Sequence, residues 1–406
     1  MRFSGFDDEW INTDLGSISS DEMYGMNSAA IDFDGLNKYI RITDISESSN
    51  KFVPNPLTSP DGKLDEKFKL KEGDIVFART GASTGKTYIY NPDDGNLYFA
   101  GFLIKFHIDK AHPKFVFYNT LKDEYSNWVN VMSVRSGQPG INSNEYKKLP
   151  INLPSFNEQR KISNFLESID RKIELLEKKH YYYNDFKKYL LQQIFAQKLR
   201  FDFDEIRLKS ISKINKGKQL NKEHMLELGK FYVLNGGQEP SGYTDSWNTS
   251  ENTITISEGG NSCGFVNFNT EKFWSGGHCY YLNKLSENID VYYLYSYLKF
   301  IEPQIMRLRV GSGLPNIQKG DIENIKIKIL PKKEQIKISN LLLSTDNKIS
   351  SIESQKDSFE IFKKGLLQQM FVVRINWRCN FKLAKSPSFN KHLLILKNKI
   401  IFIIIK

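Results

Sequence analysis

The sequence predicts an α+β protein in which two α/β globular segments are separated by two long helices. These helices should pack against each other as an antiparallel intramolecular coiled coil. Three observations predict this fold. A stretch in the middle of the chain returns near its end in constant register, so that Glu158 matches Glu334 and Gln193 matches Gln369. Both copies carry a heptad pattern of apolar residues. The segments that precede the two copies alternate like short strands, with Gly, Asp and Asn at the turns. The result is a pseudo-twofold internal repeat.

The two copies of the repeat begin and end alike. Each begins with Leu-Pro followed closely by Glu-Gln, at 153–159 and 330–335, and each ends with Leu-Leu-Gln-Gln, at 190–193 and 366–369. Ser155 and Glu158 fit a capping box, so we expect a helix over 157–197. The second helix should cover 333–371. At ~1.5 Å per residue the first helix would be about 60 Å long.

Apolar residues recur in both helices at alternating steps of four and three, which defines a heptad seam. A seam this narrow requires one partner helix, and the second copy supplies it. Polar residues interrupt both seams at matching positions, His180/Lys356 and Lys187/Lys363. We interpret His180 and Lys356 as insertions that set the register. The predicted seam contacts are Ile162, Leu166, Ile169, Ile173, Leu176, Leu190, Ile338, Leu342, Ile349, Ile352, Phe359 and Leu366.

The two globular segments share a strand-rich pattern but little sequence. In the first we expect strands at 38–42, 74–78 and 96–108 and a helix at 113–131. In the second we expect strands at 232–235, 253–257, 265–268 and 278–282 and a helix at 291–300. Their longest shared string is short, Ser136–Ile141 against Ser312–Ile317. The scaffold is therefore repeated closely, whereas the globular contents have diverged.

The expected boundaries are 1–152 and 200–329 for the globular segments and 153–199 and 330–372 for the helices, with a basic tail at 373–406. The tail holds eight Lys and Arg and no acid, and subtracting these eight from the net charge of +10 leaves +2. Any nucleic-acid surface on the rest must therefore be a local patch. We favour a functionless extension over a phosphate-binding tail.

Several classes of protein are disfavoured by what the sequence lacks. Its three cysteines show no CxxC pairing, so a reducing cytoplasm is expected. There is no signal pattern, and the longest apolar run in the tail is too short to cross a bilayer. Neither a catalytic triad nor the motifs of a nuclease or methyltransferase are found. A non-catalytic chain is therefore expected, and a coiled-coil adaptor that binds only protein stays an alternative.

The repeat resembles the specificity subunit of type I restriction-modification systems. The matching parts are the two helix openings, the two helix ends and Gly73–Gly81, and the resemblance covers about residues 1–372. It implies two target-recognition domains that read the halves of a split, asymmetric DNA sequence. It also implies that two methyltransferase subunits bind the helices and that restriction/translocase subunits join them. No cofactor is implied for this chain, because S-adenosylmethionine, ATP and Mg²⁺ would bind the partners. The second segment departs from the family by lacking an Ala-Arg-Thr-Gly string.

Polar loop residues are the candidates for DNA contact. The stretch Arg79–Thr87 approaches a P-loop, but residue 80 is Thr where glycine is required, and a strand is expected to follow. Its glycines could instead allow close approach to phosphates, although a solvated hairpin is an alternative. Arginine pairs with guanine, and Gln or Asn with adenine. The full set of expected DNA contacts is Arg79, Thr80, Ser83, Thr84, Lys86, Arg135, Gln138, Asn235, Gln238, Arg307, Arg309 and Lys319.

Overall fold

The computed structural model describes residues 2–196, 203–311, 313 and 315–371, so the tail at 373–406 lies outside the described residues. The chain forms two compact units. The first unit holds the chain up to Ser163 and again from Gly365, and the second unit is Asn164–Lys364. Both long helices, α4 (Phe156–Phe195) and α8 (Lys332–Met370), contribute to each unit.

The first unit is built around a four-stranded antiparallel sheet in the order β2-β9-β6-β7. Its elements are β1 (Ile11–Asp14), β2 (Ser19–Tyr24), β3 (Ala30–Asp32), β4 (Lys38–Ile40), β5 (Thr58–Pro60), β6 (Asp74–Ala78), β7 (Thr87–Ile89), β8 (Leu97–Phe99), β9 (Leu103–Ile108), α1 (Pro113–Asn119), α2 (Asp123–Met132), α3 (Ser143–Lys147) and β10 (Pro150–Leu153). Every residue of β6 is buried, and α1 packs on β6 and β7. Strand β6 therefore lies at the centre of the hydrophobic core, and its fixed position determines where the following loop begins.

The second unit contains a matching four-stranded antiparallel sheet in the order β12-β18-β15-β16. Its elements are β11 (Asp204–Arg207), β12 (Lys213–Lys216), β13 (Phe231–Leu234), β14 (Gly242–Thr244), β15 (Thr253–Ser257), β16 (Val266–Asn269), β17 (Trp274–Ser275), β18 (Cys279–Asn283), α5 (Val291–Phe300), α6 (Glu302–Met306), α7 (Lys319–Glu323) and β19 (Lys326–Ile329). All of β15 is buried, as β6 is in the first unit.

The smaller sheets match as well. The parallel pair β4·β8 corresponds to β13·β17, and the antiparallel pair β1·β10 corresponds to β11·β19. Strands β10 and β19, and helices α3 and α7, are separated along the chain by the same offset as the repeat. The globular folds are thus related along their length although their sequences share only short strings. Cores tolerate extensive substitution when the buried pattern is kept, which explains the difference.

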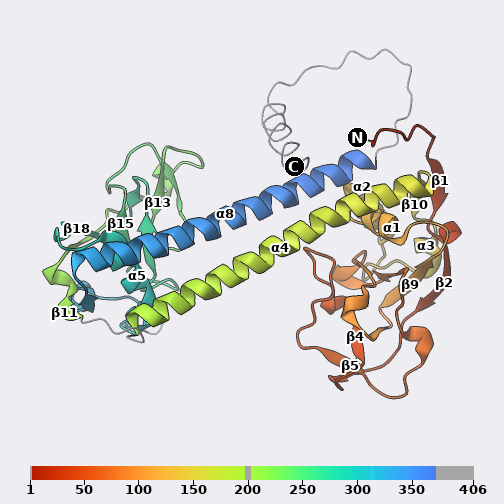
Figure 1. Ribbon diagram of the computed structural model, residues 1–406, viewed down its shortest axis with the longest axis horizontal. Coiled ribbons are helices and arrows are strands. Elements are labelled where there is room, and N and C mark those ends of the chain that lie inside the picture. Colours follow the sequence, from red (N-terminus) through yellow and green to blue (C-terminus); the bar gives the residue numbers. More distant parts are fainter. Residues whose placement is uncertain (1, 197–202, 312, 314, 372–406) are drawn as a thin grey trace, which may run out of the picture. The chain divides into compact units, whose positions relative to one another are not determined.

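The coiled coil is confirmed within the second unit, where α4 and α8 run side by side (Figure 1). Lys187 Nζ lies 2.5 Å from Asp346 Oδ1, and Lys363 Nζ lies 2.6 Å from Asp170 Oδ1. The two lysines occupy equivalent positions of the repeat, and so do the two aspartates. Exchange of partners between equivalent positions is the signature of a twofold relation, so the ion pairs establish an antiparallel, pseudo-twofold pairing.

All predicted seam positions are buried or half-buried. The interruptions at Lys187 and Lys363 are explained by their aspartate partners on the other helix. His180 and Lys356 instead contact side chains on their own helices, Asn184 and Glu360. The interpretation of His180 and Lys356 as register-setting insertions stays a prediction, because the ion pairs that join the helices involve Lys187 and Lys363, about two turns further along each helix.

The repeated glutamine at each helix opening anchors the helix to its globular unit. Gln159 accepts a hydrogen bond from the backbone N–H of His112 at 2.8 Å, and Gln335 accepts one from Asp290 at 2.8 Å. These two donors are the N-cap residues of α1 and α5. Each glutamine also donates to a carbonyl of the Leu-Pro turn before it. Both glutamines are buried, so their retention in the repeat has a structural cause.

The helix ends are anchored in a repeated way too. Phe371 packs on Phe115 in the first unit, with ring centroids 5.0 Å apart. Phe195, at the equivalent position of α4, packs on Tyr293 and Tyr297 in the second unit, with centroids 5.5 and 5.3 Å apart. Stacked and edge-to-face rings stabilise such contacts beyond the area they bury.

Two expected elements are each divided in the structure. The stretch 96–108 forms β8 and β9, because Gly101 turns the chain and donates to the carbonyl of Met26. The stretch 113–131 forms α1 and α2, because the Thr120 hydroxyl donates to the carbonyl of Phe117 and ends α1. Within the described residues, no helix is long and apolar enough to cross a membrane.

Candidate nucleic-acid interface

The segment after β6 forms a tight loop that leaves the sheet at Arg79 and returns at Lys86. Gly81 and Gly85 adopt positive φ angles of +74° and +91°. The Gly85 N–H donates to Ala78 O at 2.9 Å, and the Ala78 N–H donates to Lys86 O at 2.8 Å. Strand β7 follows directly. The loop is thus a closed hairpin without the helix that a P-loop requires.

The second glycine of this loop has a packing role. A Cβ atom at Gly85 would lie 2.6 Å from Cγ1 of Val129 on α2. Only glycine combines this close approach with the positive φ angle at low cost. The expectation that the glycines allow approach to phosphates therefore does not apply to Gly85, which faces α2.

A second loop lies against the first one. The N–H of Gly81 donates to Pro139 O at 3.0 Å, and the N–H of Ile141 donates to Arg79 O at 2.9 Å. These bonds bring the loop after α2, which carries Arg135 and Gln138, beside the loop after β6. We call residues 79–86 and 135–140 the first loop surface. It unites all seven DNA contacts predicted in the first segment.

Several of these side chains already have partners within the unit. Arg135 forms two hydrogen bonds of 2.6 and 2.5 Å with the Glu145 carboxylate and bonds the carbonyls at the end of α2. Lys86 Nζ lies 2.9 Å from Glu47, and the Thr84 hydroxyl donates to Gly81 O at 2.7 Å. Arg135 and Lys86 must exchange partners to reach DNA. Gln138 is exposed, and Thr80 and Ser83 are half-buried.

Arg79 is held by an aromatic ring. Its guanidinium carbon lies 4.9 Å from the centroid of Tyr24, the last residue of β2, in a cation–π arrangement. Its Nε is buried and has no hydrogen-bond partner. The Tyr24 side chain is 40% exposed, so the pair lies at the edge of the first loop surface.

The second unit has the same loop, although no sequence motif predicts it. Ser257-Glu258-Gly259-Gly260 occupies the place of Ala78-Arg79-Thr80-Gly81. The N–H of Gly260 donates to Pro315 O at 3.0 Å, and the N–H of Ile317 donates to Glu258 O at 2.9 Å. Gly260 and Gly264 have φ angles of +73° and +89°, close to those of Gly81 and Gly85. We call residues 258–264 and 307–316 the second loop surface, of which Ser312 and Leu314 lie outside the described residues.

The glycine that closes the second loop packs on a helix, as Gly85 does. A Cβ atom at Gly264 would lie 2.9 Å from Cα of Met306 on α6. The retained features of the two loops are thus the turn glycines and the backbone hydrogen bonds. The side chains between the glycines, Ala-Ser-Thr in one and Asn-Ser-Cys in the other, are the parts that differ.

The contacts predicted in the second segment are placed unequally. Arg309 lies next to the loop, in a hairpin that pairs with Gly259 through Asn316. Arg307 is exposed at the end of α6. Asn235 Oδ1 accepts a hydrogen bond of 3.4 Å from the His278 backbone. Lys319 begins α7 and lies 3.5 Å from Glu323. Gln238 is exposed on the segment after β13, outside the second loop surface.

Sequence reasoning missed an ion pair at this surface. Lys216 Nζ, at the end of β12, lies 2.6 Å from Glu258 Oε1, and the Tyr280 hydroxyl donates to the same oxygen at 3.0 Å. His278 Nδ1 lies 3.4 Å from the other oxygen. Burial alone would raise the pKa of Glu258, but the hydrogen bonds from Lys216 and Tyr280 outweigh it and lower the pKa. The carboxylate is therefore ionised at neutral pH.

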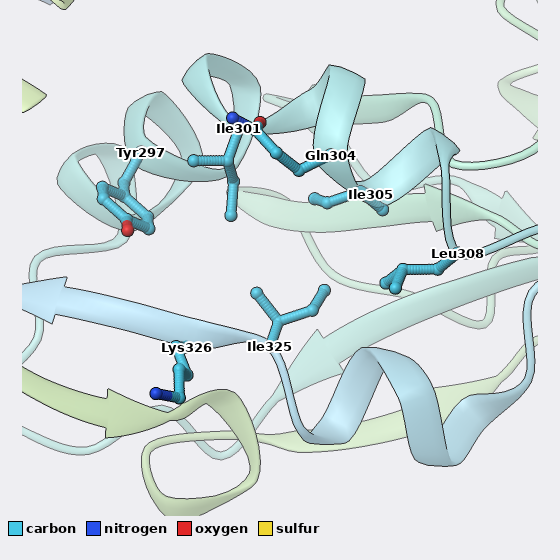
Figure 2. Close-up of a pocket in the computed structure, with 7 residues that line it drawn as sticks. All are labelled: Tyr297, Ile301, Gln304, Ile305, Leu308, Ile325 and Lys326. Carbon is cyan, nitrogen blue, oxygen red and sulfur yellow. The ribbon is translucent and has the colours of Figure 1, made fainter. Parts of the chain in front are cut away.

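Buried thiols and a small pocket are further features of the described residues. No group of three or more His, Cys, Asp or Glu in the described part of the chain is placed to hold a metal ion. Cys263 and Cys279 are buried free thiols, and burial raises the pKa of Cys279 to about 11. A pocket of about 280 Å³ in the second unit is lined mainly by apolar side chains of α5, α6 and the segment leading into β19 (Figure 2). It contains none of the predicted DNA contacts.

Two related units, each with a polar loop surface on a duplicated helical scaffold, define a class of internally duplicated, two-domain proteins. A family model for the type I restriction modification DNA specificity domain matches the chain twice, over residues 12–181 and 201–360. The chain belongs to this family, and its role is that of the DNA-recognition subunit. The alternative of an adaptor without DNA specificity is not favoured.

Relatives agree with this assignment, and a solved structure shares the fold. A putative type I specificity subunit of Mycoplasma genitalium is 34% identical over 36% of this chain and 38% of its own length. The putative type I restriction enzyme MjaX specificity subunit of Methanocaldococcus jannaschii is 25% identical over 76% of this chain and 80% of its own. The crystal structure of a type I S subunit from M. genitalium matches 91% of this chain and 97% of its own, with a TM-score of 0.68 and 19% identity, which shows the shared fold.

Proposed function

We propose that this chain reads a bipartite, asymmetric DNA target, with each loop surface docked on one half-site. The observation that carries the proposal is the same loop conformation in both units with different side chains on it. A shared backbone would dock in the same manner on both half-sites, while unlike side chains would read unlike bases. The half-sites should therefore differ in sequence.

The chemistry of the two surfaces supports contact with DNA. Arginine pairs bidentately with guanine O6 and N7, and glutamine pairs with adenine, which suits Arg79 and Gln138 on the first loop surface and Arg309 on the second. Hydroxyl and lysine groups such as Ser83 and Lys86 suit phosphate oxygens, which position the protein without specifying sequence. Exposed apolar residues flank the first loop surface, Phe102 and Val134. They could contact thymine methyl groups.

We further propose that the long helices bind methyltransferase subunits. Leu175, Tyr182, Phe186 and Tyr189 are all exposed on α4, and their spacing of seven, four and three residues places them on one face. Contiguous exposed apolar residues mark protein–protein contacts. The duplicated helices and helix openings support two such subunits, to which restriction/translocase subunits would join.

We propose that the partner subunits carry out catalysis. The complex is proposed to act in the cytoplasm. The partner subunits would carry S-adenosylmethionine, ATP and Mg²⁺, and this chain would supply the DNA sequence preference. The family resemblance and the loop chemistry support this division of labour.

DNA binding tests the proposal. The chain should be purified with and without a methyltransferase subunit encoded beside it, and binding should be measured across a salt series. Duplexes with and without the motif methylated in the cell would be compared. Non-specific binding falls steeply with salt because it depends on counterion release. We expect the complex to retain a preference for the motif at salt concentrations where the control duplex no longer binds. Equal affinity for both duplexes at every salt concentration would contradict the proposal.

A further inference from the structure

We propose that Lys216, held by Glu258, is the base-reading donor of the second unit, at the place where Arg79 lies in the first. This inference rests on the proposed function, in which both loop surfaces face DNA. It goes further by assigning a specificity-determining residue that the sequence pattern did not suggest.

The two places are equivalent by their backbone bonds. Arg79 and Glu258 each follow a wholly buried strand, and their N–H groups donate at 3.0 Å to Phe102 O and His278 O. Tyr24 and Lys216 each end the edge strand of the sheet, which one strand separates from the buried strand. Each precedes a glycine, Gly25 or Gly217, whose N–H donates to Leu103 O or Cys279 O. Added Cβ atoms at these glycines would collide with the carbonyl oxygens of 99–100 and 275–276.

The positive charge has changed strands between the units. In the first unit the cation, Arg79, comes from the end of β6 and is supported by Tyr24 from β2. In the second unit the cation, Lys216, comes from the end of β12 and is supported by Glu258 from the end of β15. Both units therefore hold one cation at equivalent places, although the residue types differ at both pairs of equivalent positions, Arg79/Glu258 and Tyr24/Lys216. If the ion pair served only packing, there would be no reason for both units to hold a cation at equivalent places.

Solvent exposure distinguishes the side chain that would contact DNA, Lys216, from the side chain that holds it, Glu258. The Lys216 side chain is 50% exposed, whereas that of Glu258 is 10% exposed. Glu258 is fixed from inside by the Tyr280 hydroxyl. An ammonium has three protons to donate, and one is directed to Glu258. The others can reach the acceptors that guanine presents in the major groove, O6 and N7. The second half-site is thus inferred to contain a G·C pair read by Lys216.

The test uses the complete complex with its methyltransferase partner, in cells whose methylated motifs are mapped by long-read sequencing. In the K216Q variant we expect methylation of the original motif to fall about 5- to 150-fold, the loss typical of one base contact. One base pair of one half-site should relax or shift toward adenine, while the other half-site is retained. E258Q should relax the same base pair, and K216R, which keeps a donor, should preserve it.

A matched control is K213Q, which removes an exposed lysine from the same strand and should leave the motif unchanged. R79Q should relax one base pair in the opposite half-site. An unchanged motif in K216Q, or a uniform loss at all positions like that of a phosphate contact, would overturn the inference. A wild-type map without a bipartite motif would instead contradict the proposed function, so the two failures are distinguishable. Because Lys216 is half-exposed, K216Q and K216R keep the test valid even if E258Q fails to fold.

Discussion

Reversing the charge of Lys187 should destabilise the coiled coil, and reversing Asp346 in the same chain should restore it. Lys187 Nζ lies 2.5 Å from Asp346 Oδ1, and both side chains are 24% exposed. The Tyr292 hydroxyl also donates to Asp346, which fixes the carboxylate. K187E would place two carboxylates against each other in a partly desolvated site. The double variant K187E/D346K restores opposite charges with the positions exchanged.

The magnitude follows from the partial burial of the pair. Exposed ion pairs contribute below about 1 kcal/mol, and breaking a fully buried one costs about 3–5 kcal/mol. At this exposure we expect loss of the attraction to cost about 1–2 kcal/mol, and like-charge repulsion to add about 1 kcal/mol. A change of 1 kcal/mol moves the thermal midpoint of a domain of 150–250 residues by about 2–4 °C. K187E should therefore unfold roughly 4–12 °C lower.

Thermal unfolding followed by circular dichroism at 222 nm measures the effect, since the long helices dominate that signal. K187E/D346K should recover most of the lost midpoint. K187E/D170K provides the matched control, because Asp170 faces Lys363 and not Lys187, so its two destabilising changes should accumulate. Recovery in K187E/D170K, or none in K187E/D346K, would refute the antiparallel register derived from the reciprocal pairs.

Further predictions concern the anchors, the loop and the helix face. Q335A should lower the free energy of unfolding by about 1–3 kcal/mol in a denaturant titration, because it leaves the part-buried N–H of Asp290 at the N-cap of α5 and the buried carbonyl of Leu330 without the glutamine. G264A should distort the second loop surface, since its Cβ would lie 2.9 Å from Met306 Cα at a φ angle of +89°. The measured result should be weaker methylation of the motif by the complex. Y182A/F186A should weaken co-purification with the methyltransferase subunit without changing the thermal midpoint, because both side chains are exposed.

Each of these variants has a control in the same unit. Q355A removes an exposed glutamine from α8 and should leave stability unchanged. G320A adds a methyl group where no atom lies within 4 Å and should leave the motif unchanged. K178A alters an exposed residue of α4 and should leave co-purification unchanged. Equal effects in a variant and its control would contradict the corresponding prediction.

The scaffold was predictable because its signals are periodic and repeated. The heptad seam continues through each helix, so an error in placing one residue does not displace the rest of the pattern. The strand 253–257 and the helix 291–300 lie where their apolar patterns predict. The single strand expected at 96–108 was wrong, because a turn at Gly101 has no periodic signal. Partners such as Lys187 and Asp346 are far apart in sequence, so only the constant register of the repeat relates their pair to the pair of Lys363 and Asp170.

The candidate site was predictable in one unit only. Arg79 stands out by its glycine-rich surroundings, whereas Glu258 does not, because the register of the helices does not align the two positions. The connection from the loop after the buried strand to the turn at 136–141 or 312–317 is shorter in the second unit. The offset between equivalent residues therefore differs between the loops and the helices. In the frame of the buried strand, where Ser257 matches Ala78, Ser-Glu-Gly-Gly aligns with Ala-Arg-Thr-Gly. Lys216 has no such signal, because its strand β12 has no sequence match to β2.

Domain exchange tests the division of recognition between the units most directly. Residues 205–329 would be replaced by the matching segment of a related specificity subunit with a different motif, keeping the residues of α4 and α8 that pack on it, such as Phe195 and Leu342. The methylated motif of the resulting complex would then be mapped in cells. We predict that one half of the motif changes and the other half is retained. A change in both halves, or in neither, would contradict recognition by two independent loop surfaces.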